Sequence, residues 1–130
     1  MTPDGLVIVP SGHGPKETMD RLAAAVEKRG LTVMARIDHA GAAAQAGMVL
    51  RPTELLIFGN AKAGTPLMQA AQTMGLDLPL KALVWQDAQD KSWIGFNDPK
   101  WLAARHGVAG EAVLDAMTAM LKAVAAEAAT

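Results

Sequence analysis

Leu80-Lys81-Ala82-Leu83-Val84-Trp85 and Ser92-Trp93-Ile94-Gly95-Phe96 are two apolar runs joined by the polar segment 86–91. Each run has the length and the β-branched and aromatic content of a strand. The short polar connection predicts an antiparallel hairpin. Because two strands then follow one another without a helix between them, the chain is not a simple βα repeat, and a fully parallel sheet is disfavoured.

The rest of the chain supplies the other elements of one α+β domain covering residues 1–130. Its length is typical of a single domain. Apolar runs predict further strands at 6–9, 31–37 and 55–58. Helical periodicity and capping residues predict helices at 15–29, 40–46, 65–74, 100–106 and 110–126. The order is β-α-β-β-β-β-α with short helices inserted, and predicts a single mixed or mainly antiparallel sheet with the two long helices on one face.

Two details of these elements follow from side-chain patterns. Strict alternation in the second strand would place Leu31, Val33, Ala35 and Ile37 on one face. Thr65 and Pro66 have the residue types of an N-cap and a first helical position, so we expect the third helix to begin there.

Composition excludes several classes of function. Lys and Arg total 12 against 13 Asp and Glu, and no basic run occurs, so we expect no nucleic-acid partner. The absence of cysteine excludes disulfides, thiolate nucleophiles and thiolate metal sites. No apolar stretch approaches membrane-spanning length, and the start lacks a signal sequence. The expected location is therefore cytoplasmic, although a secreted protein whose signal has been removed would have the same composition.

Three stretches of the chain resemble the domain-of-unknown-function 302 family across nearly its whole length. They are Arg36 to Ala40, Leu50 to Met68, and Leu76 to Lys81 taken together with Asn97 to Gly107. Ala61 departs from the pattern, since the family usually has proline there. The resemblance implies a small bacterial or archaeal domain with a TATA-binding-protein-like strand and helix order, and a homodimer. It implies no catalytic residues and no cofactor, so the cofactor is left unknown.

The turn from Gly59 to Thr65 is the most suggestive segment for ligand binding. It follows a strand, opens a helix and has the G-x-x-x-x-G spacing of a phosphate loop, but the Lys that should follow Gly64 is absent. A weaker site remains, in which the backbone N–H groups of Gly64 and Thr65 hold a carboxylate or phosphate. The simpler interpretation is that these residues form a turn and a helix cap.

Three histidines are candidates for chemistry. His39, beside Asp38 at a strand end, and His106, at a helix end, are candidate acid–base groups. Each also has a structural explanation, as a hydrogen-bonded loop residue and as a cation favoured by the helix dipole. His13, between glycines, is expected to be an exposed loop residue. Their spacing matches no metal site, so none is predicted.

The remaining candidates are polar residues at element ends and a group of methionines. Lys81 is a candidate nucleophile or anion-binding residue, and Asn60 and Asp98 lie at strand ends where ligands are often held, although both also suit turns and caps. Met34 and Met68 are expected to line a pocket, whereas the helical spacing of Met117 and Met120 assigns them to the core. Trp85 and Trp93 are expected to pack across the hairpin or at a dimer surface.

Four functions remain open at this point, one of them a purely structural or protein-interaction role. The favoured one is a domain that binds a small, possibly anionic ligand through Asn60, Gly64, Thr65, Lys81, His39 and Asp98. The second is an enzyme that uses His39 or His106 with a carboxylate or Lys81. The third is a haem- or metal-associated protein, with His39, His106 or Met68 as ligands.

Overall fold

The computed structural model describes residues 2–130 and contains one five-stranded sheet. Its strands are β1 (Leu6–Ser11), β2 (Thr32–Asp38), β3 (Thr53–Gly59), β4 (Leu80–Gln86) and β5 (Ser92–Asn97). They lie in the order β1-β5-β4-β3-β2, and every neighbouring pair is antiparallel. The predicted hairpin is confirmed, because β4 pairs with β5 in a register that places Trp85 opposite Trp93.

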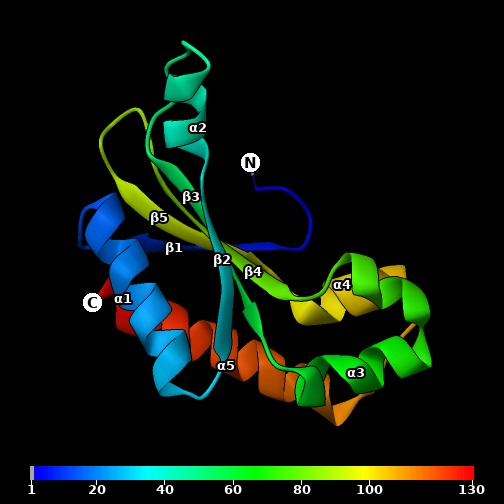
Figure 1. Ribbon diagram of the computed structural model, residues 1–130. Helices are drawn as coiled ribbons and strands as arrows, with labels where there is room; N and C mark the ends of the chain where they lie inside the picture. Colours follow the sequence, from blue (N-terminus) through cyan, green and yellow to red (C-terminus); the bar gives the residue numbers. More distant parts are fainter. Residues whose placement is uncertain (1) are drawn as a thin grey trace.

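The helices occupy three places around this sheet (Figure 1). They are α1 (Pro15–Lys28), α2 (His39–Gln45), α3 (Ala61–Ala70), α4 (Pro99–Arg105) and α5 (Ala112–Ala129), with a 3₁₀ turn η1 (Gln72–Leu76). α1 and α5 cover one face of the sheet, as predicted for the two long helices. α3 and α4 lie at one end, and β2, α2 and β3 form an arm that projects at the other. Within residues 2–130, none of the helices has both the length and the apolar character needed to cross a membrane.

The core lies between the sheet and the two long helices. Alternate residues of the central strands point towards α1 and α5 and are buried: Leu56, Phe58, Ala82, Val84, Ile94 and Phe96. They meet the apolar face of α1, where Met19, Leu22 and Val26 have no exposed surface. Burying each such side chain contributes about 1.5–3 kcal/mol, so this layer is the main source of stability.

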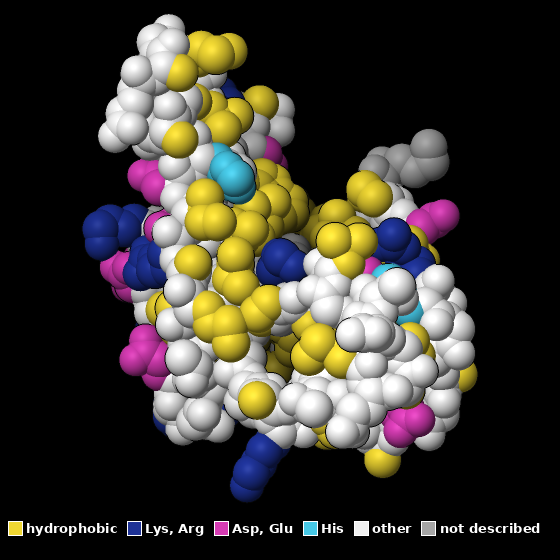
Figure 2. Space-filling model, turned by 45° about the vertical axis from the view of Figure 1, so that its right-hand side comes forward, with side chains coloured by type: hydrophobic (Ala, Val, Ile, Leu, Met, Phe, Trp, Pro, Cys, Tyr) yellow, Lys and Arg dark blue, Asp and Glu magenta, His cyan; other side chains and the backbone are white. Residues whose placement is uncertain are grey.

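In the described residues 2–130, no helix covers the other face of the sheet (Figure 1). The alternation of the strands places Leu55, Ile57, Leu83, Trp85 and Trp93 on it, all half-buried. In Figure 2, hydrophobic side chains gather between the arm and the opposite part of the molecule. Gly95 belongs to this face, because a Cβ at Gly95 would lie 2.8 Å from Cζ3 of Trp85. The indole ring therefore covers the glycine.

Strand β2 does not alternate as predicted. Its register shifts between Val33 and Ala35, so Val33 pairs with Phe58 while Ala35 pairs with Ile57. Since Phe58 and Ile57 are consecutive residues of β3, the two β2 residues point to opposite faces. The prediction that Val33 and Ala35 share a face is therefore wrong. A β-bulge of this kind adds one residue to the strand, here Met34, which is 52% exposed.

The third helix begins earlier and ends earlier than predicted. Asn60, not Thr65, is its N-cap: the Asn60 Oδ1 accepts a hydrogen bond from the Ala63 N–H at 2.8 Å. Thr65 and Pro66 lie inside the helix. Asn at the end of a strand is as strong a cap as Thr, and the earlier cap is the one used. The helix ends at Ala70, and the segment up to Leu76 forms the 3₁₀ turn η1.

Candidate functional site

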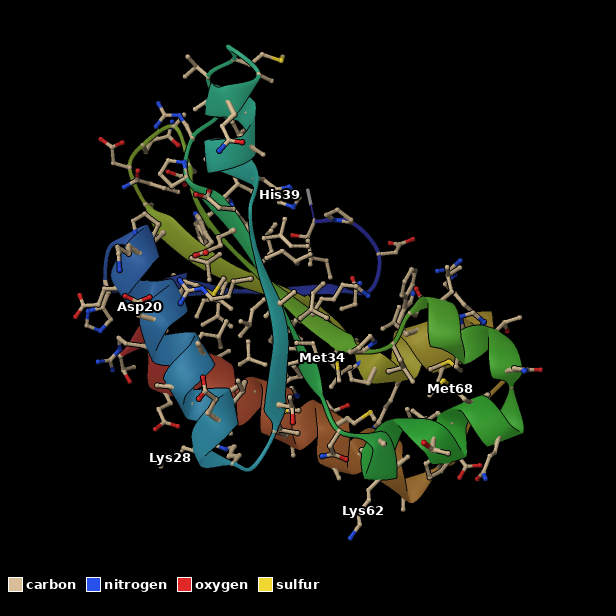
Figure 3. The ribbon with its side chains drawn as sticks, viewed as in Figure 1. Asp20, Lys28, Met34, His39, Lys62 and Met68 are labelled. Atoms are coloured by element: carbon tan, nitrogen blue, oxygen red, sulfur yellow. The ribbon has the colours of Figure 1, made fainter. Side chains whose placement is uncertain are left out.

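A pocket of about 260 Å³ opens where β3 ends and α3 begins. Its walls come from β2, α3, the segment before β4, and α5. The fourteen residues that line it include no charged side chain, and four of them are the methionines Met34, Met68, Met117 and Met120. We call it the methionine-lined pocket. Figure 3 shows two of its methionines, Met34 on β2 and Met68 on α3.

The methionines make this pocket apolar and adaptable. A thioether side chain is unbranched and polarizable, so it fits ligands of irregular shape. Met34 and Met68 were expected to line a pocket, and both do. Met117 and Met120, one helical turn apart on α5, were assigned to the core from their spacing. Met117 is 5% exposed, and it borders the pocket from the core side.

Three of the predicted ligand residues lie at this pocket, where they form part of helix α3 and its N-cap. Asn60, Gly64 and Thr65 all line it. The Gly64 N–H donates to the Asn60 carbonyl at 3.2 Å, and Asn60 Oδ1 caps the helix. The expectation that the Gly64 and Thr65 amides form an open helix start for an anion is therefore wrong, because the helix begins four residues before Thr65. These residues form part of the pocket wall and contribute no charge to it.

Lys81 lies next to this pocket on the open face of the sheet. It pairs with Ile57 across β3 and β4, and its Nζ donates to the Pro79 carbonyl at 3.3 Å. Pro79 lines the methionine-lined pocket. Lys81 is therefore a predicted charged residue that contacts the pocket wall, through Pro79.

His106 belongs to a different cluster, between η1 and α4. Its Nε2 lies 2.6 Å from Asp77 Oδ2 and its Nδ1 lies 2.8 Å from Thr73 Oγ1. Arg105 also donates to Asp77, at 3.2 Å. A neutral His106 protonated on Nε2 satisfies both contacts, donating to Asp77 and accepting from the Thr73 hydroxyl. We call these four residues the Asp77 cluster.

The Asp77 cluster has the connectivity of a hydroxyl, a base and an orienting carboxylate. Its residues line none of the four pockets described in residues 2–130. Its contacts join η1 to the end of α4, across segments that are about thirty residues apart. The geometry therefore explains His106 as a structural tie.

The remaining predicted residues are separate from both places. His39 is exposed at the start of α2, on the arm (Figure 3). Asp38 and Asp98 act as N-caps, accepting from the Gly41 N–H at 2.9 Å and the Lys100 N–H at 3.0 Å. His13 is half-buried and contacts Glu17 at 3.2 Å. Within residues 2–130, no three His, Asp or Glu side chains come together as a metal site would require.

A second, polar depression lies on the helix side of the arm, where its charges neutralise one another. Arg36 donates to Glu54 and to Asp20, each at 3.0 Å. The hydrogen bond to Glu54 is the main reason that the pKa of Arg36 is raised. The pKa of Asp20 is lowered, first by its hydrogen bond from Lys16 and then by Arg36. Of the charged residues that line this depression, Lys16, Arg36 and Glu54 are in ion pairs and Asp38 caps α2, so it offers little free charge to a ligand.

The model of the domain of unknown function DUF302 matches residues 7–127. The chain belongs to the DUF302 family. The fold agrees: a crystal structure of an uncharacterized conserved DUF302 protein from Bacillus stearothermophilus superposes with a TM-score of 0.77 and 20% identity, covering 98% of this chain and 97% of that one.

Curated relatives of this DUF302 chain carry a different description. Proteins named fluoride-specific ion channel FluC 1 from Brucella suis and Brucella abortus are 49% identical to it over 115 residues. The match covers 87% of this chain but 45% and 43% of those proteins. The chain thus spans less than half the length of the curated relatives it matches.

Several residues of these sites were missed from the sequence. Asp77 and Thr73 are two of them, because nothing local indicates that a histidine some thirty positions later will reach them. The available signal was the acidic residue in Leu76-Asp77-Leu78-Pro79, one of the stretches that carry the family resemblance. The contribution of α5 to the pocket had no signal, since Met117 and Met120 fit a core-facing helix equally well.

Proposed function

We propose that this DUF302 domain binds a small, largely apolar molecule in the methionine-lined pocket. The observation that carries the proposal is a pocket whose lining includes four thioethers and no charged side chain. Ligand sites are typically concave and mostly apolar, with volumes from about 300 Å³ upwards, so a pocket of about 260 Å³ suits a small ligand. Each methylene that enters it contributes about 0.8 kcal/mol.

The wall formed by α3 supports this proposal, because the helix has an unusually weak sequence. Gly64 and Pro66 both lie inside it. In helix interiors, glycine costs about 1 kcal/mol and proline about 3 kcal/mol relative to alanine. Pro66 also removes an N–H donor from the second turn. Elements that admit ligands are drawn from the less stable parts of a fold, and α3 is such an element beside the pocket.

Calorimetric titration with 1-octanol tests the proposal. Gly64 lines the pocket, and a leucine there projects into it, so Gly64→Leu should abolish octanol binding. Ala70→Leu is the matched control, since it adds the same side chain at an exposed position of the same helix outside the pocket. Octanol should bind the natural protein and the control with equal affinity. Equal binding to Gly64→Leu, or none to the natural protein, contradicts the proposal.

The relatives support a second candidate, in which the domain acts beside a membrane channel. Proteins named as fluoride channels contain a segment 49% identical to this chain within a longer sequence. Joining two domains in one chain raises their effective concentration. Such a fusion therefore favours a lasting association between this domain and the rest of the longer protein. Fluoride itself requires hydrogen-bond donors, and the methionine-lined pocket supplies few. Sodium fluoride should therefore leave the melting temperature unchanged relative to sodium chloride, whereas a specific rise would show that the domain binds the ion.

The family resemblance implies a homodimer, and the arm offers a surface for it. Met48, Val49 and Leu50 are consecutive, exposed hydrophobic residues in the loop between α2 and β3. A second copy of the chain would remove them from water. Light scattering after gel filtration should give twice the mass of 13.6 kDa, and Val49→Asp should halve it. A monomeric natural protein, or a dimeric Val49→Asp, contradicts this assignment.

A further inference from the structure

Lys81 is the basic residue at the centre of an apolar surface. The register of the sheet places it opposite Ile57 and on the same face as Leu83 and Trp85. No other Lys or Arg of the five strands has this orientation, because Arg36 points to the helix side, where it meets Asp20 on α1.

The ammonium group of Lys81 is held without a counter-charge. Within residues 2–130 it forms no ion pair. Its one hydrogen bond goes to the Pro79 carbonyl at 3.3 Å, which satisfies one of its three donors. A half-buried cation on an apolar surface loses part of its hydration, and an anion that reaches it restores that interaction.

The position of Pro79 connects this cation with the methionine-lined pocket. Pro79 lines the pocket and its carbonyl holds the Lys81 ammonium, and a Cβ at Gly59, another lining residue, would lie 3.7 Å from the Pro79 Cβ. Lys81 itself does not line the pocket, so a molecule whose apolar part fills the pocket would reach Lys81 by extending past Pro79. The required ligand has two parts, a hydrocarbon part and a charged head.

We propose that the ligand of this site is a small amphipathic monocarboxylate, with its hydrocarbon chain in the methionine-lined pocket and its carboxylate at Lys81. This rests on the proposed binding of an apolar molecule by the same pocket. One unpaired cation matches one negative charge. A dianionic phosphate would require more basic residues than this face provides, and Lys62, at the start of α3, points away from the body of the protein (Figure 3).

Calorimetric titration with octanoate and 1-octanol, which share a chain and differ in charge, separates the two proposals. The natural protein should bind octanoate about tenfold more tightly than octanol, as expected for one charge-assisted hydrogen bond. Lys81→Met keeps the apolar stem and removes the charge. It should lose about tenfold in octanoate affinity and leave octanol affinity unchanged. Lys62→Met removes the same charge from the nearby helix and should leave both affinities unchanged.

The outcomes are distinguishable. Octanoate that binds no better than octanol, or an octanoate affinity that survives Lys81→Met, overturns the assignment of Lys81 and leaves the apolar pocket standing. Equal losses of octanoate affinity in Lys62→Met and Lys81→Met also overturn it, because they would reflect the change in the overall charge of the protein and not a contact with Lys81. Failure of both compounds to bind any of the three proteins overturns the pocket proposal together with this one.

Discussion

Removing the carboxylate of Asp77 should destabilise the protein far more than removing an exposed carboxylate. Asp77 Oδ2 accepts from His106 Nε2 at 2.6 Å, and the two side chains are only 17% and 8% exposed. A hydrogen bond to a charged group contributes about 1.5–3 kcal/mol. The contact with the half-exposed Arg105 adds at most about 1 kcal/mol, because solvent screens it. We therefore expect Asp77→Ala to lower the free energy of unfolding by about 2–3 kcal/mol.

Urea unfolding followed by tryptophan fluorescence measures this change. Asp115→Ala is the matched control, because its ion pair with Lys100 is also 2.6 Å long but the two side chains are 72% and 56% exposed. The control should cost less than about 1 kcal/mol. Adding His106→Ala and the double variant isolates the coupling between Asp77 and His106, which should be about 1–2 kcal/mol.

Equal losses for Asp77→Ala and Asp115→Ala, or a coupling near zero, would refute the structural explanation of the Asp77 cluster. The hydroxyl, histidine and carboxylate would then be held together for a reason other than stability. A search for ester or amide hydrolysis dependent on Thr73 would become the next experiment.

Three further changes have expected outcomes. The pKa of Glu127 is lowered from 4.5 to about 2, chiefly by its hydrogen bond from Arg29. The contribution of this carboxylate to stability is therefore complete above pH 4.5 and is lost as the pH falls towards 2. Acid unfolding should therefore show a smaller loss over that range in Glu127→Gln than in the natural protein. Gly64→Ala should raise the free energy of unfolding in urea by up to about 1 kcal/mol, because alanine has the higher helix propensity and the nearest side-chain atoms to its Cβ lie at 3.7 Å. A lower free energy of unfolding would show that the pocket wall has no room for the methyl group. Gly95→Ala should cost about 1–3 kcal/mol in the same assay, since Trp85 occupies the space, and an unchanged midpoint would mean that the indole moves freely.

Much of the fold could be predicted because its signals are local. The hairpin from Leu80 to Phe96 follows from two apolar runs and a polar turn, and the element order follows from helical periodicity and caps. Where two local signals competed, the prediction failed. Asn60 and Thr65 are both good N-caps, and only packing decides between them. The β-bulge at Met34 leaves no mark in the sequence, because alternation continues on either side of it.

The candidate site was harder to predict, because it is assembled from residues far apart in the chain. Asn60 and Gly64 could be placed at a strand end beside a helix, and Met68 beside them. The far wall comes from α5, some fifty residues later, and the pairing of Asp77 with His106 is equally non-local. Lys81 could be singled out as a charge in an apolar run, but its missing counter-ion is visible only once the neighbouring strands are in place.

The position of β1 has a consequence for the order in which the protein folds. Leu6 lies opposite Asn97, and β5 is the only strand that pairs with β1 in residues 2–130. The strands β2 to β5 are joined by shorter connections, so they can pair earlier, since closing a short loop loses less chain entropy. On the ribosome, β1 emerges before the other four strands of this sheet and would be the last of them to find its partner. Until then the free edge of β5 is open to pairing with another chain.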